Sequence, residues 1–340
     1  MTVNIGLVTG DALVLGCDSI ASVSNYFLDP FVNVDLDGEG NPVLDESGKL
    51  CIRFETDDLQ SIVTDAWGNV TKMFPIHQGN TNVVAVTAGL AKMCDRPISS
   101  LGAEFLAKRL ASETQLVTVE EIAKSFQDFM REKYDEHYGD SPIPPRFRDG
   151  PEFLVGGFGR DDDFPSLYRL NIQANTTKPS FADGHAGLAW NGQSDAVERF
   201  IKGFDGPLQS DVASCVEEAL EKYHSEATVK VAEIVNTVLA AVGAEMPPDI
   251  DAALPNPGKV SLPWKNYRLR IAYSNLPLQE AIHLVSFLVN LQSGKARFAP
   301  GVATVGGRVH IGVVTKSEGF KLLNEPNLVH KYTGFSDDPQ

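Results

Sequence analysis

The chain has 340 residues, of which 29 are Lys or Arg and 45 are Asp or Glu, so its formal net charge is −16. This acidic balance argues against nucleic acid and anionic membrane surfaces as partners, because both attract basic proteins. Hydrophobic residues make up 43% of the chain, which is enough for a sizeable core, and the length at first allows two domains.

The sequence carries no targeting or redox pattern. It contains no apolar run of about 18 residues that would span a membrane, and its first residues lack the basic and apolar regions of a signal peptide. The four cysteines, Cys17, Cys51, Cys94 and Cys215, form no CxxC pair. We therefore expect a cytoplasmic protein with free thiols. Without a P-loop, HExxH or GxSxG motif, we expect no metal and no cofactor.

The first part of the chain predicts mainly strands. Strands at 2–9 and 12–18 are joined by a Gly-Asp turn, and further strands are expected at 72–76 and 83–88. Between them, a segment from 27 to about 65 is interrupted by Asp, Gly, Asn and Pro, which indicates an extended hairpin or a surface insertion.

The remaining elements occur in blocks. A helix is expected at 98–112, and a second begins at the capping box of Thr118 and Glu121. Strands then follow at 153–158, 166–172 and 187–190, helices at 194–203, 210–242 and 277–292, and a terminal hairpin at 308–315 and 319–323. Segregated blocks of strands and helices predict an α+β fold with antiparallel sheets.

The most informative residue for function is Thr2. It follows Met1, and a small second residue permits removal of an initiator methionine. Thr2 would then carry a hydroxyl nucleophile and a free α-amine, whose unperturbed pKa of about 7.7–8.0 suits a general base near neutral pH. A threonine paired with its own amine is one way to activate a weak nucleophile.

Several segments together resemble proteasome β-type subunits, an N-terminal-nucleophile hydrolase family. The resemblance rests on residues 2–22, 72–76, 88–91, 154–157 and 309–320. It implies a four-layer αββα sandwich with two antiparallel sheets, and a homo-oligomer. The motif spacing then favours one domain over the whole chain, 1–340, with insertions at about 27–65 and about 205–275.

The resemblance also implies site residues. Asp18 stands sixteen residues after Thr2, at the family's position for the catalytic carboxylate, and Lys72 matches the lysine beside the nucleophile. Gly89 matches the glycine whose amide forms the oxyanion hole. Lys49 competes with Lys72, but only Lys72 leads promptly into the turn at Gly89. By the same resemblance the substrate-binding residues are Ala21, Ser22 and Thr87.

Two family positions are changed in this chain. Gln193 stands where the family has a serine, with Ser194 next to it, and the segment 302–307 lacks the family's late Asp and Ser. Ser194 and Thr304 are therefore possible auxiliary residues. An ion pair without catalytic function is the alternative interpretation of Asp18 and Lys72.

The expected function is that of a threonine-type peptidase that forms an acyl-enzyme and hydrolyses peptide bonds in a peptide or unfolded-protein substrate. Two alternatives remain open. One is a catalytically weak or inactive structural or regulatory subunit of the same fold, and the other is an N-terminal-nucleophile amidase that acts on small amides.

Overall fold

The computed structural model describes residues 2–27, 34–52, 60–112, 115–139, 141, 143–243 and 262–323. Met1 and parts of both expected insertions (28–33, 53–59 and 244–261) lie outside the described residues. The chain divides into two compact units, one of Met1–Ser194 with Ala272–Gln340 and one of Asp195–Ile271. The interpretation as a single domain with two insertions stays a prediction.

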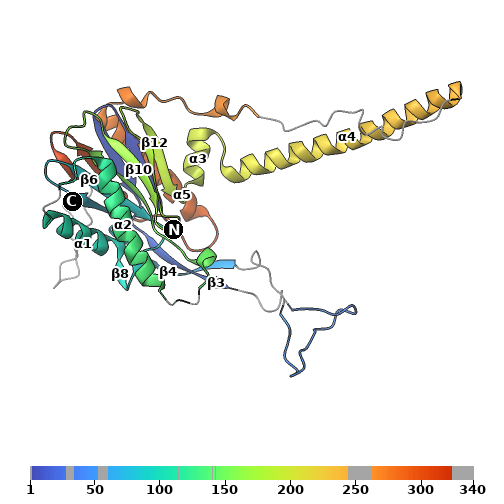
Figure 1. Cartoon of the computed structure of the whole chain (residues 1–340), viewed down its shortest axis with the longest axis horizontal. Coiled ribbons are helices and arrows are strands. Elements are labelled where there is room, and N and C mark those ends of the chain that lie inside the picture. The colour runs from blue at the N-terminus through green and yellow to red at the C-terminus, as the bar shows by residue number, and fades with distance from the viewer. Residues whose placement is uncertain are drawn as a thin grey trace. The chain divides into compact units, whose positions relative to one another are not determined.

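The first unit is built on two five-stranded antiparallel sheets (Figure 1). The first sheet has the order β12-β1-β2-β13-β14, and the second has the order β11-β10-β9-β6-β5. Their strands are β1 (Val3–Val8), β2 (Ala12–Cys17), β5 (Met73–His77), β6 (Asn82–Ala88), β9 (Glu152–Phe158), β10 (Ser166–Asn171), β11 (Thr176–Phe181), β12 (Gly187–Gly192), β13 (His310–Thr315) and β14 (Gly319–Leu322). Two small pairs join β3 (Ala21–Phe27) to β4 (Gln60–Trp67), and β7 (Lys92–Met93) to β8 (Arg96–Pro97).

Three helices pack on these sheets. Helix α5 (Leu278–Phe298) contacts β1, β2 and β13 of the first sheet, and α1 (Ile98–Leu110) and α2 (Val119–Tyr138) contact strands of the second. The two sheets contact each other, for example through β1 and β6. All six residues of both β1 and β2 are buried, as expected for strands covered on both faces. Gly16 permits the close approach of α5, because a Cβ there would lie 2.4 Å from Val285 Cγ1.

An aromatic cluster joins α1 and α2 to the second sheet. The ring of Phe126 on α2 lies 5.1 Å from that of Phe105 on α1 and 5.0 Å from that of Phe153 on β9, both edge to face. Such pairs add about 0.5–1.5 kcal/mol beyond the burial of their area. The capping box at Thr118 fixes the start of α2, because its side chain accepts from Glu121 N–H. These contacts hold α1 and α2 against the second sheet.

The second unit contains α3 (Asp195–Lys202), α4 (Gly206–Val242) and the short 3₁₀ helix η4 (Trp264–Tyr267). Asp205 is the last residue of the connection between α3 and α4. Its carboxylate accepts from Leu208 N–H at the start of α4 and pairs with Arg199 of α3 at 2.6 Å. Two further 3₁₀ turns, η2 (Pro145–Phe147) and η5 (Tyr273–Asn275), belong to the first unit.

The expected α+β fold with antiparallel sheets is confirmed. Strand β11 was not expected, because its sequence Thr-Thr-Lys-Pro-Ser-Phe contains a proline, and the two-residue strands β7 and β8 were not expected either. Proline is tolerated on an edge strand, and β11 lies at the edge of its sheet. Within the described residues, no helix is long and apolar enough to cross a membrane.

Two helical glycines should respond oppositely to substitution by alanine. A Cβ on Gly102 of α1 would lie 2.2 Å from Phe74 Cε2, whereas one on Gly294 of α5 would meet nothing within 4 Å. We expect Gly102→Ala to lower the free energy of unfolding by about 1–3 kcal/mol through overpacking. Gly294→Ala should raise it by up to about 1 kcal/mol through helix propensity. Urea denaturation of both variants measures this, and equal shifts of the two midpoints would contradict it.

Candidate functional site

Three polar side chains from distant parts of the sequence lie together at one end of the two sheets. Thr2 immediately precedes β1, Asp18 immediately follows β2, and Lys72 immediately precedes β5. All three residues are buried, with exposed fractions of 5%, 0% and 3%. The hairpin of β1 and β2 sets Thr2 beside Asp18, because Asn4 pairs with Cys17 in its register.

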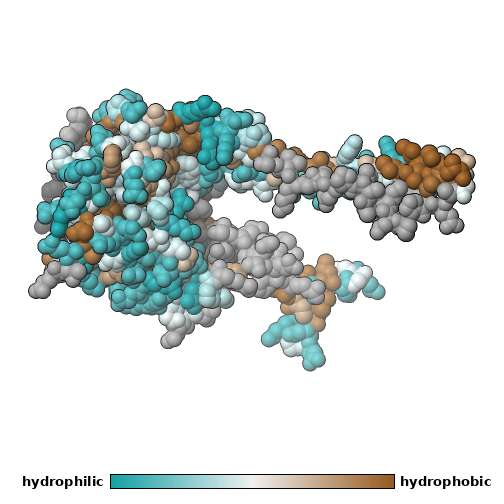
Figure 2. All heavy atoms as spheres, turned by 45° about the horizontal axis from the view of Figure 1, so that its top comes forward, coloured by the Kyte–Doolittle hydropathy of each residue, from teal (hydrophilic) through white to brown (hydrophobic). Residues whose placement is uncertain are grey.

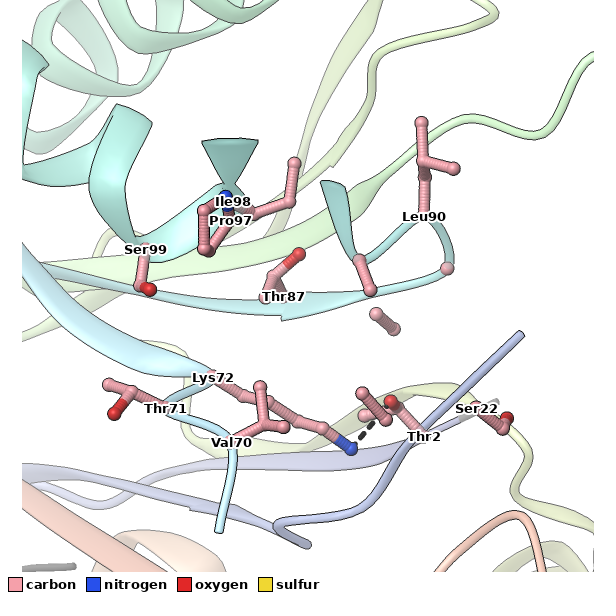
Figure 3. Close-up of a pocket in the computed structure, with 14 residues that line it drawn as sticks. Thr2, Ser22, Val70, Thr71, Lys72, Thr87, Leu90, Pro97, Ile98 and Ser99 are labelled. Carbon is pink, nitrogen blue, oxygen red and sulfur yellow. Dashed lines mark hydrogen bonds between the residues drawn. The ribbon is translucent and has the colours of Figure 1, made fainter. Parts of the chain in front are cut away.

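Lys72 joins the other two residues. Its Nζ donates to Thr2 Oγ1 at 2.7 Å (Figure 3). It also donates to Asp18 Oδ1 at 2.8 Å and to the carbonyl of Ile20. The ammonium group therefore has three acceptors, which matches its three donors. Lys72, and not Lys49, occupies the position beside Asp18, since the Lys49 side chain is exposed.

The Asp18 carboxylate accepts three backbone N–H groups in addition to Lys72. Oδ1 accepts from Val3, and Oδ2 accepts from Ile20 and Gly306, at 3.1–3.2 Å. Four donors compensate the cost of burying this charge, which would be large for an isolated carboxylate. Asp18 consequently fixes the start of β1, the segment after β2 and the loop before β13 to one another.

Burial changes the acid–base properties of the neighbouring groups. It lowers the pKa of Lys72 below its usual 10.5, while the Asp18 charge opposes this shift. Burial also raises the pKa of the Cys17 thiol to about 12, so this thiol stays protonated near neutral pH and is no competing nucleophile. The pKa of His310 is lowered, first by burial and then by the Lys72 charge, which favours a neutral imidazole.

The end of β12 holds the main chain of Thr2. Gln193 N–H donates to the Thr2 carbonyl oxygen at 2.6 Å, and Thr304 Oγ1 donates to Gln193 Oε1 at 2.9 Å. Gly192 adopts a positive φ of 77°, and a Cβ there would lie 2.0 Å from the Thr2 oxygen, so only glycine fits. Of the two auxiliary residues, Thr304 is therefore linked to Thr2 through Gln193, and Ser194 is next in sequence to Gln193.

A pocket opens directly beside Thr2 and Lys72 (Figure 3). It is lined by Thr2, Ala21, Ser22, Val70, Thr71, Lys72, Thr87, Ala88, Gly89, Leu90, Ala91, Pro97, Ile98 and Ser99. Every residue expected to bind substrate or to form the oxyanion hole is in this lining. Among the described side chains, the Thr87 hydroxyl is buried without a hydrogen-bond partner. Of the residues in this lining, only Lys72 has a side chain that is charged near neutral pH.

The start of α1 contributes pocket residues that the sequence did not indicate. Two consecutive residues with positive φ, Cys94 at 49° and Asp95 at 58°, turn the chain between β7 and β8 and lead it into α1. Pro97, Ile98 and Ser99 then line the pocket. No sequence signal marked this turn, because Cys-Asp is not among the glycine-containing pairs that usually predict it.

Gly89 forms the turn on the opposite side of the pocket. Its φ is 82°, and a Cβ at this position would lie 2.5 Å from the carbonyl oxygen of Gly150. Any other residue would combine an unfavourable backbone conformation with a steric clash. The glycine therefore lets this turn pack closely against the backbone of Gly150.

In the part of the chain that the structure describes, no three His, Cys, Asp or Glu residues group in a way that could hold a metal ion. The groups that line the pocket instead offer a hydroxyl, an ammonium group and backbone amides. These are the groups used for covalent acyl transfer.

No family model and no curated protein matches the sequence. Three of the solved structures to which this chain is similar are the following. The first is an Anbu (Gly-1) mutant from Hyphomicrobium sp. strain MC1, with 10% identity over 95% of this chain and 87% of that chain and a TM-score of 0.46. The second is Anbu (ancestral beta-subunit) from Yersinia bercovieri, with 13% identity over 95% of this chain and 87% of that chain and a TM-score of 0.45. The third is the helical assembly of the Anbu complex from Pseudomonas aeruginosa, with 13% identity over 92% of this chain and 81% of that chain and a TM-score of 0.42.

These findings correct the sequence-based family assignment. The expected membership of the proteasome β-subunit family is wrong, because no family model or curated protein supports it and the similar structures are Anbu proteins. At TM-scores and identities this low, the similarity carries no conclusion about the activity of this chain.

The hydrogen bonds of the site predict an asymmetry between Asp18 and Lys72. Asp18→Asn should lower the free energy of unfolding by about 3–5 kcal/mol, because it leaves the buried ammonium group uncompensated and turns an amide NH₂ towards N–H donors. Lys72→Met should cost less than half as much, because Asp18 keeps its three backbone donors. Thermal and urea denaturation measure both values. A larger loss in Lys72→Met would contradict this prediction.

Proposed function

We propose that this protein is a hydrolase that cleaves peptide bonds with Thr2 as its nucleophile after Met1 is removed. The observation that carries the proposal is the 2.7 Å hydrogen bond from Lys72 Nζ to Thr2 Oγ1, with Asp18 behind Lys72 and a pocket in front. A hydroxyl is a weak nucleophile, and a neighbouring positive charge favours its alkoxide-like form.

In the first step the Thr2 Oγ attacks the substrate carbonyl carbon, and the hydroxyl proton passes to the Thr2 α-amine. Negative charge then develops on the former carbonyl oxygen. The Gly89 N–H would stabilise this oxyanion, and one such donor is worth about 3–4 kcal/mol. Collapse of the intermediate breaks the C–N bond, and the leaving amine takes the proton from the α-ammonium group. The product is an ester between Thr2 and the acyl part of the substrate.

In the second step water hydrolyses this ester. The α-amine, neutral again, accepts a proton from the attacking water, and Thr2 Oγ is the leaving group that recovers a proton. Lys72 remains charged through both steps, held by Asp18 and the Ile20 carbonyl. No cofactor is required by this sequence of steps.

The pocket suits an extended peptide. Ser22 follows the first residue of β3, and Gly89 follows β6, so a substrate strand could pair with backbone on both sides. Ala21 and Thr87 would contact the side chain next to the cleaved bond. The lining offers no carboxylate, and its one ammonium group is already paired with Asp18, so an uncharged side chain is favoured at this position.

The remaining parts of the proposal concern the fold and its setting. With helices on the outer sides of two packed sheets, we interpret the first unit as a four-layer αββα sandwich. The four free cysteines suit a reducing, cytoplasmic environment. Self-association of the chain is also proposed. The similar structure from Pseudomonas aeruginosa is described as a helical assembly, which is a property of that protein.

Intact-mass spectrometry of the purified protein, before and after treatment with a β-lactone, tests Thr2 directly. We expect loss of the Met1 mass and one adduct that peptide mapping assigns to Thr2, because only a free N-terminal threonine combines the nucleophile with its base. Thr2→Ala should lose the adduct and the turnover of a fluorogenic peptide, while Thr2→Ser should keep both at a reduced rate.

The same measurements separate the alternatives. A chain that keeps Met1 and takes no adduct would sink the enzymatic proposal and favour a structural subunit. Adduct formation without turnover of any peptide, together with release of ammonia or amine from small amides, would favour an amidase. Circular dichroism of Thr2→Ala controls for loss of folding.

The rate of adduct formation should depend on pH at both ends. On the acid side it should rise as the α-amine loses its proton, near the usual pKa of about 7.7–8.0. On the alkaline side the rate should begin to fall at a pH below 10.5, the usual pKa of lysine. Burial lowers the pKa of Lys72, so its charge is lost before that pH is reached. Rates measured from about pH 6 to 11 check this, and a rate still rising above 10.5 would contradict the role of charged Lys72.

A further inference from the structure

Helix α4 has no packing partner among the described residues that buries any of its side chains. It spans 37 residues, and none of them is buried. Its ends are well formed, with Asp205 capping the N-terminus and Gly243 in the left-handed conformation after the C-terminus. Since helices in proteins gain most of their stability by packing an amphipathic face, a helix this long is expected to have a partner for that face.

One side of α4 is apolar along most of its length. We define the α4 stripe as Val216, Leu220, Tyr223, Ala227, Val231, Ile234 and Val238. Successive members are four or three residues apart, which keeps them on one face of the helix. None of the six acidic residues of α4 belongs to the stripe. Tyr223, Ile234 and Val238 are 72%, 64% and 57% exposed, and Figure 2 shows hydrophobic surface gathered over the C-terminal part of α4.

The stripe has the same spacing when it is followed in either direction. Ala227 is its centre, with Val216 eleven residues before it and Val238 eleven residues after it. In an antiparallel pair of α4 helices, Ala227 would face itself, and Leu220 would face Ile234 of the second copy. A small residue at the centre lets the two helices approach closely, and the larger residues on either side interdigitate.

The charges of α4 also favour the antiparallel arrangement. Glu226 and Lys230 lie on the same edge of the stripe, and in an antiparallel pair each Lys230 comes beside Glu226 of the second copy, twice by symmetry. Glu217 and Glu218 would stand opposite the uncharged segment 234–242. A parallel pair in register would instead set this edge of one copy against the opposite edge of the other, so Glu226 and Lys230 would not meet between the copies.

The area available is near that of a specific interface. The overlapping span, 212–242, is about 46 Å long, and with a helix width of about 10 Å it offers roughly 460 Å² per copy. The total of roughly 900 Å² lies close to the roughly 1,000 Å² expected of a specific interface, so the pair should dissociate on dilution.

We propose that the α4 stripe is a self-association surface, on which α4 packs antiparallel against α4 of a second copy of this chain. This surface is independent of the chemistry proposed for Thr2, so either proposal can fail without the other.

Two valine substitutions on opposite faces of α4 provide a matched test. Val238 belongs to the stripe and is 57% exposed, while Val229 faces away from it and is 58% exposed. In sedimentation velocity of the full chain over a dilution series, Val238→Glu should weaken association about tenfold or more, because it buries a carboxylate against Val216 of the second copy. Val229→Glu should leave the association unchanged. Equal effects of the two, or no concentration-dependent association in the unmodified chain, would overturn the proposal.

A charge exchange tests the orientation. Glu226→Lys and Lys230→Glu should each weaken association, because each sets like charges side by side between the copies. The double variant restores opposite charges and should recover the association of the unmodified chain. Failure of the double variant to recover would overturn the antiparallel arrangement.

Cysteine cross-linking gives a readout that does not depend on other contacts between copies. In a Cys215→Ser background, Ala227→Cys should form an intermolecular disulfide, because this position faces itself. Val216→Cys and Val238→Cys should cross-link when the two variants are mixed, but not separately. Cross-linking of each variant with itself indicates a parallel pair and overturns the proposal, as does the absence of any cross-link.

Discussion

The buried ion pair between Lys72 and Asp18 is the interaction on which the rest of the site depends. Neither charge is exposed, so each would be costly to bury alone. Their attraction offsets that cost only because further hydrogen bonds satisfy the remaining donors of Lys72 and the remaining acceptors of Asp18. Lys72 finds its other acceptors in Thr2 and Ile20, and Asp18 finds its other donors in three backbone amides. Satisfying the pair therefore fixes the position of the Thr2 hydroxyl.

The two sheets make this arrangement possible. Thr2 and Asp18 lie at the ends of neighbouring strands of the first sheet, whereas Lys72 immediately precedes β5, in the second sheet. The sheets must therefore be held face to face for the pair to form. The apolar core between the sheets and the aromatic cluster behind the second sheet supply that constraint. A change such as a new methyl group at Gly102 acts on the site through packing, although it touches none of the three residues.

Much of the fold could be predicted because its elements carry local signals. The β1–β2 hairpin places a Gly-Asp turn between two apolar strands, and α2 begins at a capping box that the structure contains in full. Thr2, Asp18 and Lys72 were indicated by a resemblance whose family assignment proved wrong, yet the structure brings their side chains together. Their catalytic roles stay a proposal.

Other parts of the site depend on contacts that no local pattern announces. Gly306 donates its backbone N–H to Asp18 from a segment 288 residues later, and a backbone donor leaves no side-chain signature. Gln193 holds the Thr2 carbonyl, although the resembled family has a serine at this position. The pocket wall at 97–99 follows from a turn of unusual composition. In each case the decisive group is a main-chain atom or a turn geometry set by tertiary packing.

The segment 302–307 lacks the Asp and Ser that the resembled family has at these positions. This segment still contacts the site, because Gly306 N–H reaches Asp18 and the Thr304 hydroxyl reaches Gln193. Both contacts act on groups that hold Thr2, one through Lys72 and one through the Thr2 carbonyl. The segment therefore supports the position of Thr2 without offering a side chain to its amine. If the proposed chemistry operates, the hydrogen bonds from Gln193 N–H to the Thr2 carbonyl and from Lys72 Nζ to the Thr2 hydroxyl hold the residue that carries the α-amine.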